Sequence, residues 1–316
     1  MIIAITGGSG FIGRKLVPRH LAQGDEVRVL SRSASGGDVD VPGSVKWCHG
    51  DLLTSEKLQS FVDGVDILYH CAGEIRDETR MKEVHVEGTQ RLIEAATGRV
   101  GRWVQLSSVG AYGKILNGTV TEQTKLNPCG MYEITKVDSD SLVSRAALEG
   151  AFECVILRPS NVYGAGMSNQ SLYGLIEMIR RGWFFFIGEP GAAANYIHVD
   201  NVVEALVRCG VQAEASGQVY NLSDHQTMEQ FVATISTSLG KTMPRLRLPE
   251  WTIRLSVKLL GNLPKFPLTK ARVDALTGRA IYSTTKIEHE LGYRHIVSME
   301  AGLIELTKSW QRRLGE

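Results

Sequence analysis

Short apolar segments alternate with longer amphipathic segments throughout the first half of the chain. The short segments are rich in β-branched and aromatic residues, which is typical of buried strands. In the longer segments apolar residues recur every three or four positions, as they do in a helix with one buried face. Strands are expected at Ile2–Thr6, Glu26–Ser31, Val45–Cys48, Val65–Tyr69, Trp103–Ser107 and Cys154–Arg158. Helices are expected at Phe11–Gln23, Ser55–Phe61, Met81–Thr97 and Met131–Leu148.

The alternation predicts an α/β protein with a doubly wound parallel sheet, because right-handed crossovers place helices on both faces of such a sheet. The alternation of strands and helices ends after about residue 165. Residues 1–165 are therefore expected to form the main domain, and residues 166–316 mainly a smaller C-terminal domain. Segments near residues 196–222 are expected to rejoin the main sheet. They are Tyr196–Val199 and Val219–Leu222. Later helices are expected at Leu172–Arg181, Val199–Cys209 and Met228–Leu239.

Composition narrows the class of partner. The chain of 316 residues carries 35 Lys and Arg against 34 Asp and Glu, which gives no electrostatic case for binding nucleic acid. A small-molecule partner is therefore expected. The five cysteines include no Cys-x-x-Cys pair, so neither a disulfide framework nor a metal site is expected. Reduced thiols favour a cytoplasmic protein.

The first residues also bear on location. Met1–Thr6 follows a strand pattern with no basic flank or cleavage site, so it is not interpreted as a signal peptide. No apolar run reaches the ~18 residues that a membrane-spanning helix needs. A soluble protein without stable membrane insertion is expected.

A glycine-rich segment follows the first expected strand directly and opens the first expected helix. Glycines three residues apart allow a tight turn, a close approach of backbone to a pyrophosphate, and tight packing of helix on strand. The free N–H groups of the helix N-terminus favour an anion at the same place. The residues expected at a dinucleotide are Gly7, Gly10, Phe11, Ile12 and Gly13.

The next two strands end in residues that can define the nucleotide. Arg32, flanked by Ser31 and Ser33, stands where an NAD-binding protein usually has a carboxylate for the ribose hydroxyls. A guanidinium instead suits a 2′-phosphate, so NADP(H) is favoured over NAD(H), although a solvated loop arginine is the alternative. After the third strand, Asp51 beside Leu52 is expected either at the adenine or as a helix cap.

Three residues have the chemistry of a proton-transfer centre. Tyr132 and Lys136 are four residues apart on one expected helix, so they share a face and the ammonium can favour the phenolate. Ser108 stands at the carboxyl end of an expected strand, where ligands bind in this architecture, although a plain turn is the alternative. The same Tyr-Lys spacing recurs at Tyr282 and Lys286, far from the nucleotide-binding half, and is assigned to structure or to the second domain.

Several segments together resemble the extended short-chain dehydrogenases/reductases. This family has the Rossmann fold and includes NAD(P)-dependent epimerases, dehydratases and reductases. The resemblance covers almost the whole chain. Besides the glycine turn, the matching segments are Cys71–Gly73, Ser107–Gly113, Tyr132–Lys136, Leu157–Gly164, Tyr196–Asn201 and Leu291–Tyr293.

The resemblance implies a role for each matched residue. Ser108 is expected to orient the substrate oxygen, Tyr132 to act as acid and base, and Lys136 to bind the nicotinamide ribose and tune Tyr132. Asn161 is expected to face the substrate. Further cofactor contacts are implied for Cys71, Ala72, Gly73 and Pro159. The family's usual homodimer is also implied, formed by the helices expected at 81–97 and 131–148.

Three positions depart from the family pattern. His85 replaces a frequent Asn, and it is expected either to steady the active-site water and backbone in the same way or simply to pack. Val109 stands where dehydratases have an acid, which disfavours dehydration. Ala194 stands where many nucleotide-sugar enzymes have an arginine for the substrate pyrophosphate, although Arg279 could substitute.

Three functions remain open. The first is keto-reduction or epimerisation of a nucleotide-activated sugar. The second is NADPH-dependent reduction of a non-sugar ketone, because Leu268–Trp310 is similar to dihydroflavonol reductases and 3β-hydroxysteroid dehydrogenases. The third is a non-catalytic NADP-sensing protein, which the fold alone would permit.

Two apolar segments each allow more than one interpretation. Trp183–Ile187 could line a substrate cavity, but a buried strand is favoured. Trp251–Leu260 could touch a membrane or form a lid, but core packing or cover of the second domain is favoured.

Overall fold

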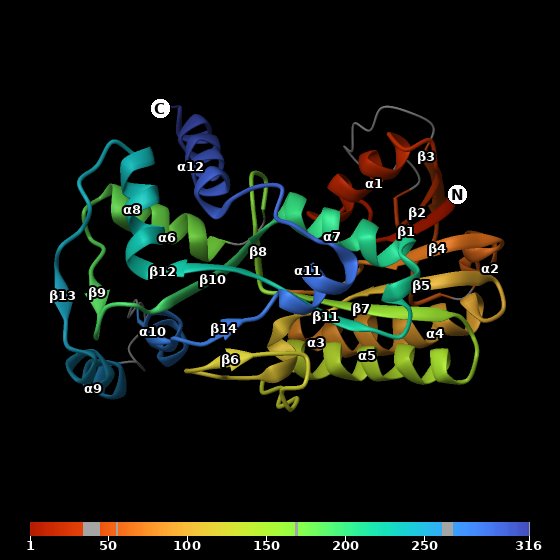
Figure 1. Cartoon of the computed structure of the whole chain (residues 1–316), viewed down its shortest axis with the longest axis horizontal. Helices are drawn as coiled ribbons and strands as arrows, with labels where there is room; N and C mark the ends of the chain where they lie inside the picture. Colours follow the sequence, from red (N-terminus) through yellow and green to blue (C-terminus); the bar gives the residue numbers. More distant parts are fainter. Residues whose placement is uncertain (34–44, 55, 168–169, 261–267, 316) are drawn as a thin grey trace.

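A seven-stranded parallel sheet forms the centre of the computed structural model, which describes residues 1–33, 45–54, 56–167, 170–260 and 268–315 (Figure 1). In their order across the sheet the strands are β11 (Val219–Leu222), β7 (Glu153–Pro159), β5 (Val100–Leu106), β4 (Val65–His70), β1 (Ile2–Thr6), β2 (Glu26–Ser31) and β3 (Val45–His49). The order reverses between β1 and β4. In a doubly wound sheet, ligands bind beyond the carboxyl ends of the strands at such a reversal.

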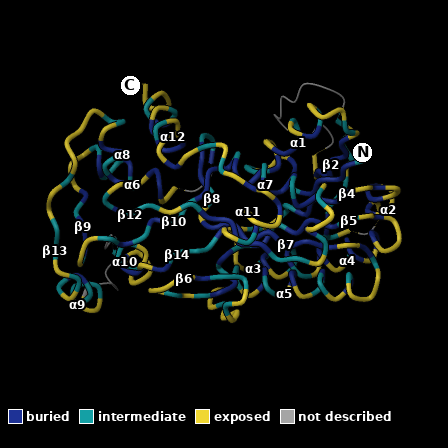
Figure 2. The backbone as a smooth tube through the Cα atoms, in the orientation of Figure 1, coloured by how far each residue is buried: buried dark blue, intermediate teal, exposed yellow. Residues whose placement is uncertain are grey.

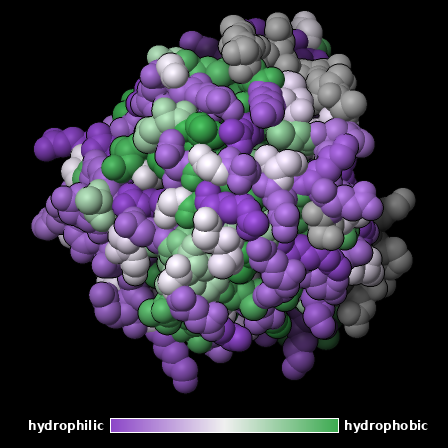
Figure 3. All heavy atoms as spheres, turned by 90° about the vertical axis from the view of Figure 1, so that its right-hand side faces the viewer, coloured by the Kyte–Doolittle hydropathy of each residue, from purple (hydrophilic) through white to green (hydrophobic). Residues whose placement is uncertain are grey.

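Helices cover both faces of this sheet and bury its central strands (Figure 2). One face packs against α1 (Gly13–Leu21), α7 (Val199–Val211) and α11 (Thr285–Leu291). The other face packs against α2 (Leu58–Val62), α4 (Gly88–Ala96) and α5 (Met131–Leu148). The predicted fold class is therefore confirmed. Figure 3 shows mainly hydrophilic side chains, with scattered apolar ones, on the end of the molecule at the right of Figure 1.

A smaller region lies beyond the carboxyl ends of the central strands. Its three-stranded sheet consists of β12 (Asp224–Thr227), β10 (Ala193–His198) and β8 (Asn161–Tyr163). Around it lie α6 (Gln170–Arg180), α8 (Met228–Ser238) and α12 (Met299–Leu314). Two short parallel pairs join β9 (Phe186–Ile187) to β13 (Arg247–Leu248) and β6 (Thr119–Val120) to β14 (Ile281–Tyr282). The remaining described helices here are α9 (Glu250–Leu260) and α10 (Lys270–Thr277), whereas the short turn η3 (Ala213–Ala215) packs on the main sheet between α7 and β11.

One of the two returning segments was placed wrongly. Val219–Leu222 joins the main sheet as β11, as expected, but Tyr196–Val199 does not join it. Instead β10 pairs in parallel with β8 and antiparallel with β12. β11 pairs with β7 on the side away from β5, so that edge of β7 is not available to β10. Where β7 ends, Ser160 N donates to Leu222 O at 2.8 Å. Hence β10 pairs with the short strand that continues beyond Ser160.

Most other boundaries agree with the predictions within a few residues, and α5 matches its predicted range. The expected helix 81–97 was wrong as a single element, because a π-helical turn, η1 (Glu83–Glu87), separates α3 (Glu78–Lys82) from α4. The strand expected at Trp103–Ser107 begins three residues earlier. Ser55, the first residue of another expected helix, lies outside the described residues. No helix in the described part of the chain is long and apolar enough to cross a membrane.

Candidate functional site

A pocket of about 250 Å³ lies at the carboxyl ends of the strands on both sides of the β1–β4 reversal. The walls come from the turn after β1, the ends of β2 and β3, and the loop after β4. The predicted cofactor residues that line it are Gly7, Gly10, Arg32, Asp51, Leu52, Ala72 and Gly73. Most of the residues assigned to the nucleotide thus meet around one cavity.

The glycine turn leaves no room for side chains. Gly7 has a positive φ of 69°, and a Cβ built on it would lie 2.8 Å from Ala72 N. A Cβ on Gly13 would lie 2.2 Å from Gly7 O, so this glycine allows α1 to begin directly against the turn. Gly10 N donates to Gly7 O at 2.9 Å, which closes the turn. The resulting cradle of bare backbone fits the pyrophosphate of a dinucleotide.

Other predicted cofactor residues do not line this pocket. Phe11 packs into the apolar cluster of the smaller region, and Ile12 packs against the core beneath α1. Cys71 is an uncharged thiol, because burial raises its pKa to about 12. Pro159 ends β7, where it is paired with Leu222. Gly13 supports the turn from behind.

Arg32 and Asp51 were both expected at the adenosine part of the nucleotide, and both line the pocket. Arg32 is exposed beside the pocket, and the neighbouring backbone is fixed because Ser33 N donates to Ser31 Oγ at 3.1 Å. Asp51 Oδ1 accepts a hydrogen bond from Leu53 N at 3.0 Å. Asp51 therefore lines the pocket and caps the turn that follows β3, but it does not cap a helix, because α2 begins at Leu58 after Lys57.

The pocket also includes residues that the sequence reasoning missed. Glu74, Arg80 and Val84 line it from the segment that follows β4. Arg80 and Val84 are four residues apart on consecutive helical turns, so both face the same side. The four-residue spacing of Arg80 and Val84 is the sequence feature that could have predicted that both residues face the pocket. Arg80 adds a second guanidinium to the wall of a cavity expected to hold phosphates.

The first turn of α5 carries the expected tyrosine and lysine. This helix starts after Gly130 because Glu133 accepts hydrogen bonds from Gly130 N at 3.1 Å and from Cys129 N at 2.7 Å. Lys136 is buried, and its Nζ donates to Leu106 O at 2.5 Å, at the end of β5. Burial lowers the pKa of Lys136.

Ser108 lies against the same helix turn. Its Oγ accepts from Gly110 N at 3.1 Å and so caps the 3₁₀ turn η2 (Val109–Tyr112). A Cβ added to Gly110 would lie 3.1 Å from Glu133 Cγ and 3.4 Å from Ser108 Oγ, so the serine turn packs directly on α5. The serine turn therefore packs on the first turn of α5, which carries Tyr132, and Lys136 reaches the end of β5 two residues before Ser108.

Tyr132 is held as a neutral phenol. Burial, with a smaller contribution from the carboxylate of Asp140, raises its pKa to about 12. A protonated phenol at neutral pH can donate a proton to a substrate oxygen. In this state Tyr132 is ready to act as an acid rather than as a base.

His85 connects the loop after β4 to α5. Its Nε2 accepts from Glu74 N at 2.8 Å, and its Nδ1 is 2.8 Å from Thr135 Oγ1. Burial, together with the charge of Lys136, lowers the pKa of His85 to about 4, so the ring is neutral. The ring also packs edge-on against Tyr132, with centroids 5.6 Å apart. His85 thus fixes the backbone after β4 and packs against Tyr132, whereas its expected role in steadying an active-site water stays a prediction.

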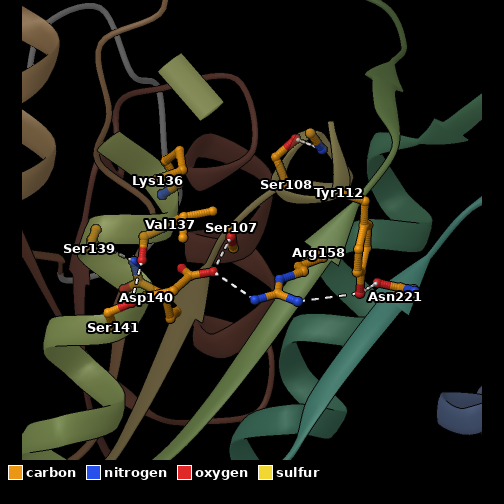
Figure 4. Close-up of polar contacts among 12 residues, drawn as sticks. Ser107, Ser108, Tyr112, Lys136, Val137, Ser139, Asp140, Ser141, Arg158 and Asn221 are labelled. Carbon is orange, nitrogen blue, oxygen red and sulfur yellow. Dashed lines mark hydrogen bonds and ion pairs between the residues drawn. The ribbon is translucent and has the colours of Figure 1, made fainter. Parts of the chain in front are cut away.

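A buried chain of polar contacts lies behind these residues (Figure 4). Asp140 Oδ2 accepts from Ser107 Oγ at 2.6 Å and from Arg158 Nη2 at 3.3 Å. Arg158 Nη1 donates to the Tyr112 hydroxyl at 3.3 Å, and that hydroxyl donates to Asn221 Oδ1 at 2.8 Å. The contacts tie together β5, α5, β7 and β11 directly beneath Ser108 and Lys136.

The second Tyr-Lys match does not form a pair of this kind. Lys286 Nζ donates to Gln218 Oε1 at 2.8 Å and to Val219 O at 3.1 Å, at the edge strand β11. Tyr282 packs in a small apolar cluster with Tyr112. Both residues therefore have structural partners, in agreement with their assignment.

Two further predicted residues lie toward the smaller region. Asn161 is exposed at the start of β8, and its Nδ2 donates to Asn195 O at 3.3 Å. Arg279 is exposed, and its Nη2 donates to Glu189 O at 3.2 Å. Among the described residues, no group of three or more His, Cys, Asp or Glu is arranged to hold a metal ion.

A dinucleotide cradle on a doubly wound sheet, beside a serine, a tyrosine and a lysine, is typical of NAD(P)-dependent enzymes that transfer hydride. Residues 3–223 match the model of the NAD dependent epimerase/dehydratase family, and the chain belongs to this family. It is accordingly an NAD(P)-dependent oxidoreductase or epimerase.

Relatives of known activity cover nearly the whole chain. It is 26% identical to the 3beta-hydroxysteroid-dehydrogenase/decarboxylase isoform 2 of Arabidopsis thaliana, over 95% of this chain but only 60% of that protein. It is 28% identical to the 4-hydroxy-2-methyl-3-oxo-4-farnesyl-3,4-dihydroquinoline-1-oxide ketoreductase of Stigmatella aurantiaca, over 96% of this chain and 95% of that one. The crystal structure of UDP-glucose 4-epimerase from Thermotoga maritima shares the fold, with a TM-score of 0.77 and 21% identity over 99% and 100% of the two chains.

Proposed function

We propose that the protein interconverts a ketone and a secondary alcohol with NADP(H), through Ser108, Tyr132 and Lys136. The observation that carries the proposal is the packing of the serine turn on the first turn of α5, beside the nucleotide pocket. The bound cofactor supplies or accepts the hydride at the substrate carbon. The protein must therefore orient the substrate oxygen and move one proton.

Each of the three residues has a task in this mechanism, and Lys136 is also proposed to bind the nicotinamide ribose. The Ser108 hydroxyl donates a hydrogen bond to the substrate oxygen, which fixes the carbonyl and stabilises negative charge on it. The Tyr132 phenol gives its proton to that oxygen as the carbon receives the hydride, and the product is the alcohol. The buried ammonium of Lys136 then stabilises the phenolate until solvent returns a proton. Because its pKa is raised, Tyr132 at neutral pH is in the protonated state from which reduction starts.

The proposed substrate is a nucleotide-activated sugar, handled by reduction or epimerisation. Arg279 supports this choice. Asn195 Nδ2 of β10 donates to Ala280 O at 2.8 Å, so Arg279 lies next to this strand. The family resemblance implies an arginine for the substrate pyrophosphate on the same strand, at the position of Ala194. The test is to identify the nucleotide that copurifies with the protein and to assay UDP-sugars and ketones with NADPH. An epimerase would isomerise the sugar without net NADPH consumption. No turnover of any substrate with intact NADPH binding would favour the non-catalytic alternative.

A non-sugar ketone is the second candidate. Ala194 stands where many nucleotide-sugar enzymes have an arginine for the substrate pyrophosphate. It is 2% exposed within β10, so this position offers neither a cation nor an exposed side chain to such a substrate. The ketoreductase of Stigmatella aurantiaca and the steroid dehydrogenase of Arabidopsis thaliana have names that describe larger apolar substrates. In the same assay, NADPH oxidation with farnesylated or steroid ketones but not with UDP-sugars would select this candidate.

NADP(H) is expected to bind more tightly than NAD(H), because the Arg32 guanidinium lies beside the pocket and can pair with a 2′-phosphate. Arg32→Asp should narrow or reverse the preference by removing the cation and adding a carboxylate for the ribose. Dissociation constants of both cofactors, from fluorescence titration, measure the effect. Arg80→Ala is the comparison: Arg80 also lines the pocket, and a loss of affinity that is equal for both cofactors would assign it to the phosphates that they share. Equal constants in the unaltered protein would contradict the prediction.

We also propose a homodimer that buries the outer faces of α4 and α5. Ile134 and Leu148 are exposed on α5 and stand fourteen residues apart, so they lie on nearly one side of the helix. Light scattering at micromolar concentration should give twice the mass of the chain. Leu148→Glu should shift the mass toward the monomer, whereas Leu314→Glu on α12 should not. A monomeric mass for the unaltered protein would refute the dimer.

A further inference from the structure

The helix α9 turns an apolar stripe outward. Trp251, Leu255 and Leu259 are 69%, 48% and 70% exposed. They follow one another at intervals of four residues, so they form one continuous stripe along the helix. The sequence favoured core packing or cover of the second domain for this segment, and the opposite face of α9 agrees with that interpretation, because Ile253 and Val257 pack into an apolar cluster there. The stripe itself stays exposed. A tryptophan and two leucines in a row leave a large apolar surface facing solvent.

The inner face of α9 is fully engaged, so the helix cannot turn to bury the stripe. Ile253 and Val257 pack into an apolar cluster with Ile187 and Val273. Arg254 fixes the helix further, because it donates to Glu250 at 2.6 Å and to Asp274 of α10 at 2.9 Å. The stripe is therefore a permanent surface of the folded protein.

The surroundings of the stripe are strongly basic, although the whole chain is nearly neutral. Residues 241–260 and 268–279 carry eight Lys and Arg against two acidic residues, Glu250 and Asp274. Both acids are already neutralised by Arg254. Lys241, Arg245, Lys258 and Lys270 are exposed and have no acidic partner among the residues that the structure describes. Lys258 lies seven residues after Trp251 and so flanks the stripe on the same side of α9.

We infer that α9 is a docking surface for an anionic lipid bilayer, lying in the plane of the membrane surface. An apolar stripe flanked by lysine and arginine is the pattern of interfacial helices, which bury the stripe among acyl chains and keep the cations at the phosphates. The charge selects a lipid surface over a second copy of this chain, since two equally basic patches would repel each other. Such docking needs no spanning helix.

The position of α9 connects this surface to the proposed active site. Lys114, two residues beyond the serine turn η2, forms an ion pair with Asp274 of α10, which is the residue that Arg254 of α9 contacts. The N–H of Ala280 donates to Leu116 O at 3.1 Å. Figure 1 places α9 and α10 at the end of the molecule away from β2 and β3. The membrane surface would thus adjoin the substrate side and leave the nucleotide side in water.

Sedimentation with lipid vesicles tests the inference on the full chain with NADP⁺ present. The protein should bind vesicles of phosphatidylcholine mixed with phosphatidylglycerol, bind pure phosphatidylcholine far less, and release from the mixed vesicles at high salt. Leu255→Glu combined with Leu259→Glu should weaken binding by about a hundredfold, since each leucine contributes about tenfold when buried. Leu314→Glu, an exposed leucine on α12, is the matched control and should bind as the unaltered protein does. Tryptophan emission should shift to the blue on binding, and Trp251→Phe but not Trp183→Phe should abolish that shift.

Two results would overturn the inference. One is the absence of binding to the mixed vesicles, or binding that the double variant does not weaken. The other is concentration-dependent association in solution that the double variant abolishes, without vesicle binding, which would assign the stripe to a second copy of the chain. NADPH affinity and ketone turnover are measured on the same variants. A failure of the proposed catalytic function would appear there and would leave the vesicle result unchanged.

Discussion

Tyr132→Phe is expected to lower turnover by about 10²–10⁴-fold while cofactor affinity stays nearly unchanged. The substitution removes only the hydroxyl whose proton the proposed mechanism transfers. The ring still fills the same space and still packs against the edge of His85, with centroids 5.6 Å apart in the unaltered protein. Steady-state rates and fluorescence titration with NADPH measure the two effects separately.

The second tyrosine of the chain with the same spacing to a lysine provides the matched control. Tyr282→Phe should leave the chemical step almost unchanged, because Lys286 is bonded to Gln218 and Val219 rather than directed at a reacting group. Lys136→Met should reduce both turnover and cofactor affinity, and Ser108→Ala should mainly reduce turnover. If Tyr282→Phe abolished turnover and Tyr132→Phe did not, the catalytic centre would be placed wrongly.

Arg158→Met is expected to lower the free energy of unfolding by about 3–5 kcal/mol. The side chains of Arg158 and Asp140 are 6% and 5% exposed, so removal of the guanidinium leaves a buried carboxylate without its cation. The Tyr112 hydroxyl also loses a donor. Denaturant unfolding followed by fluorescence measures the loss.

A double variant separates the charge from the packing. Arg158→Met with Asp140→Leu should recover part of the lost stability, because the carboxylate that lost its guanidinium is removed as well, but the buried ammonium of Lys136 then loses the favourable charge of Asp140. Arg19→Met is the control on the surface: it breaks the 2.9 Å contact with Glu204, but Glu204 keeps Arg208, so the change should be below ~1 kcal/mol. An unchanged unfolding free energy for Arg158→Met would show that the buried pair contributes little.

The sequence was sufficient wherever short-range spacing determines structure. Apolar periodicity located the strands of the central sheet and α5, because burial on one face imposes a period of about two or 3.6 residues. The glycine turn was equally local, since Gly7 and Gly13 have no space for a Cβ. The four-residue spacing of Tyr132 and Lys136 fixed their common helix face. These features follow from the chain's own neighbours.

The tertiary structure decided what depends on contacts between distant segments. Pairing of β10 with β8 required that β11 had taken the edge of β7, which no local pattern records. Arg80 entered the nucleotide pocket, and Arg158 found Asp140, only because the crossovers bring their elements together. The outward stripe of α9 was decided in the same way, because which apolar side chains of Trp251–Leu260 become buried depends on the surface that the rest of the fold leaves free.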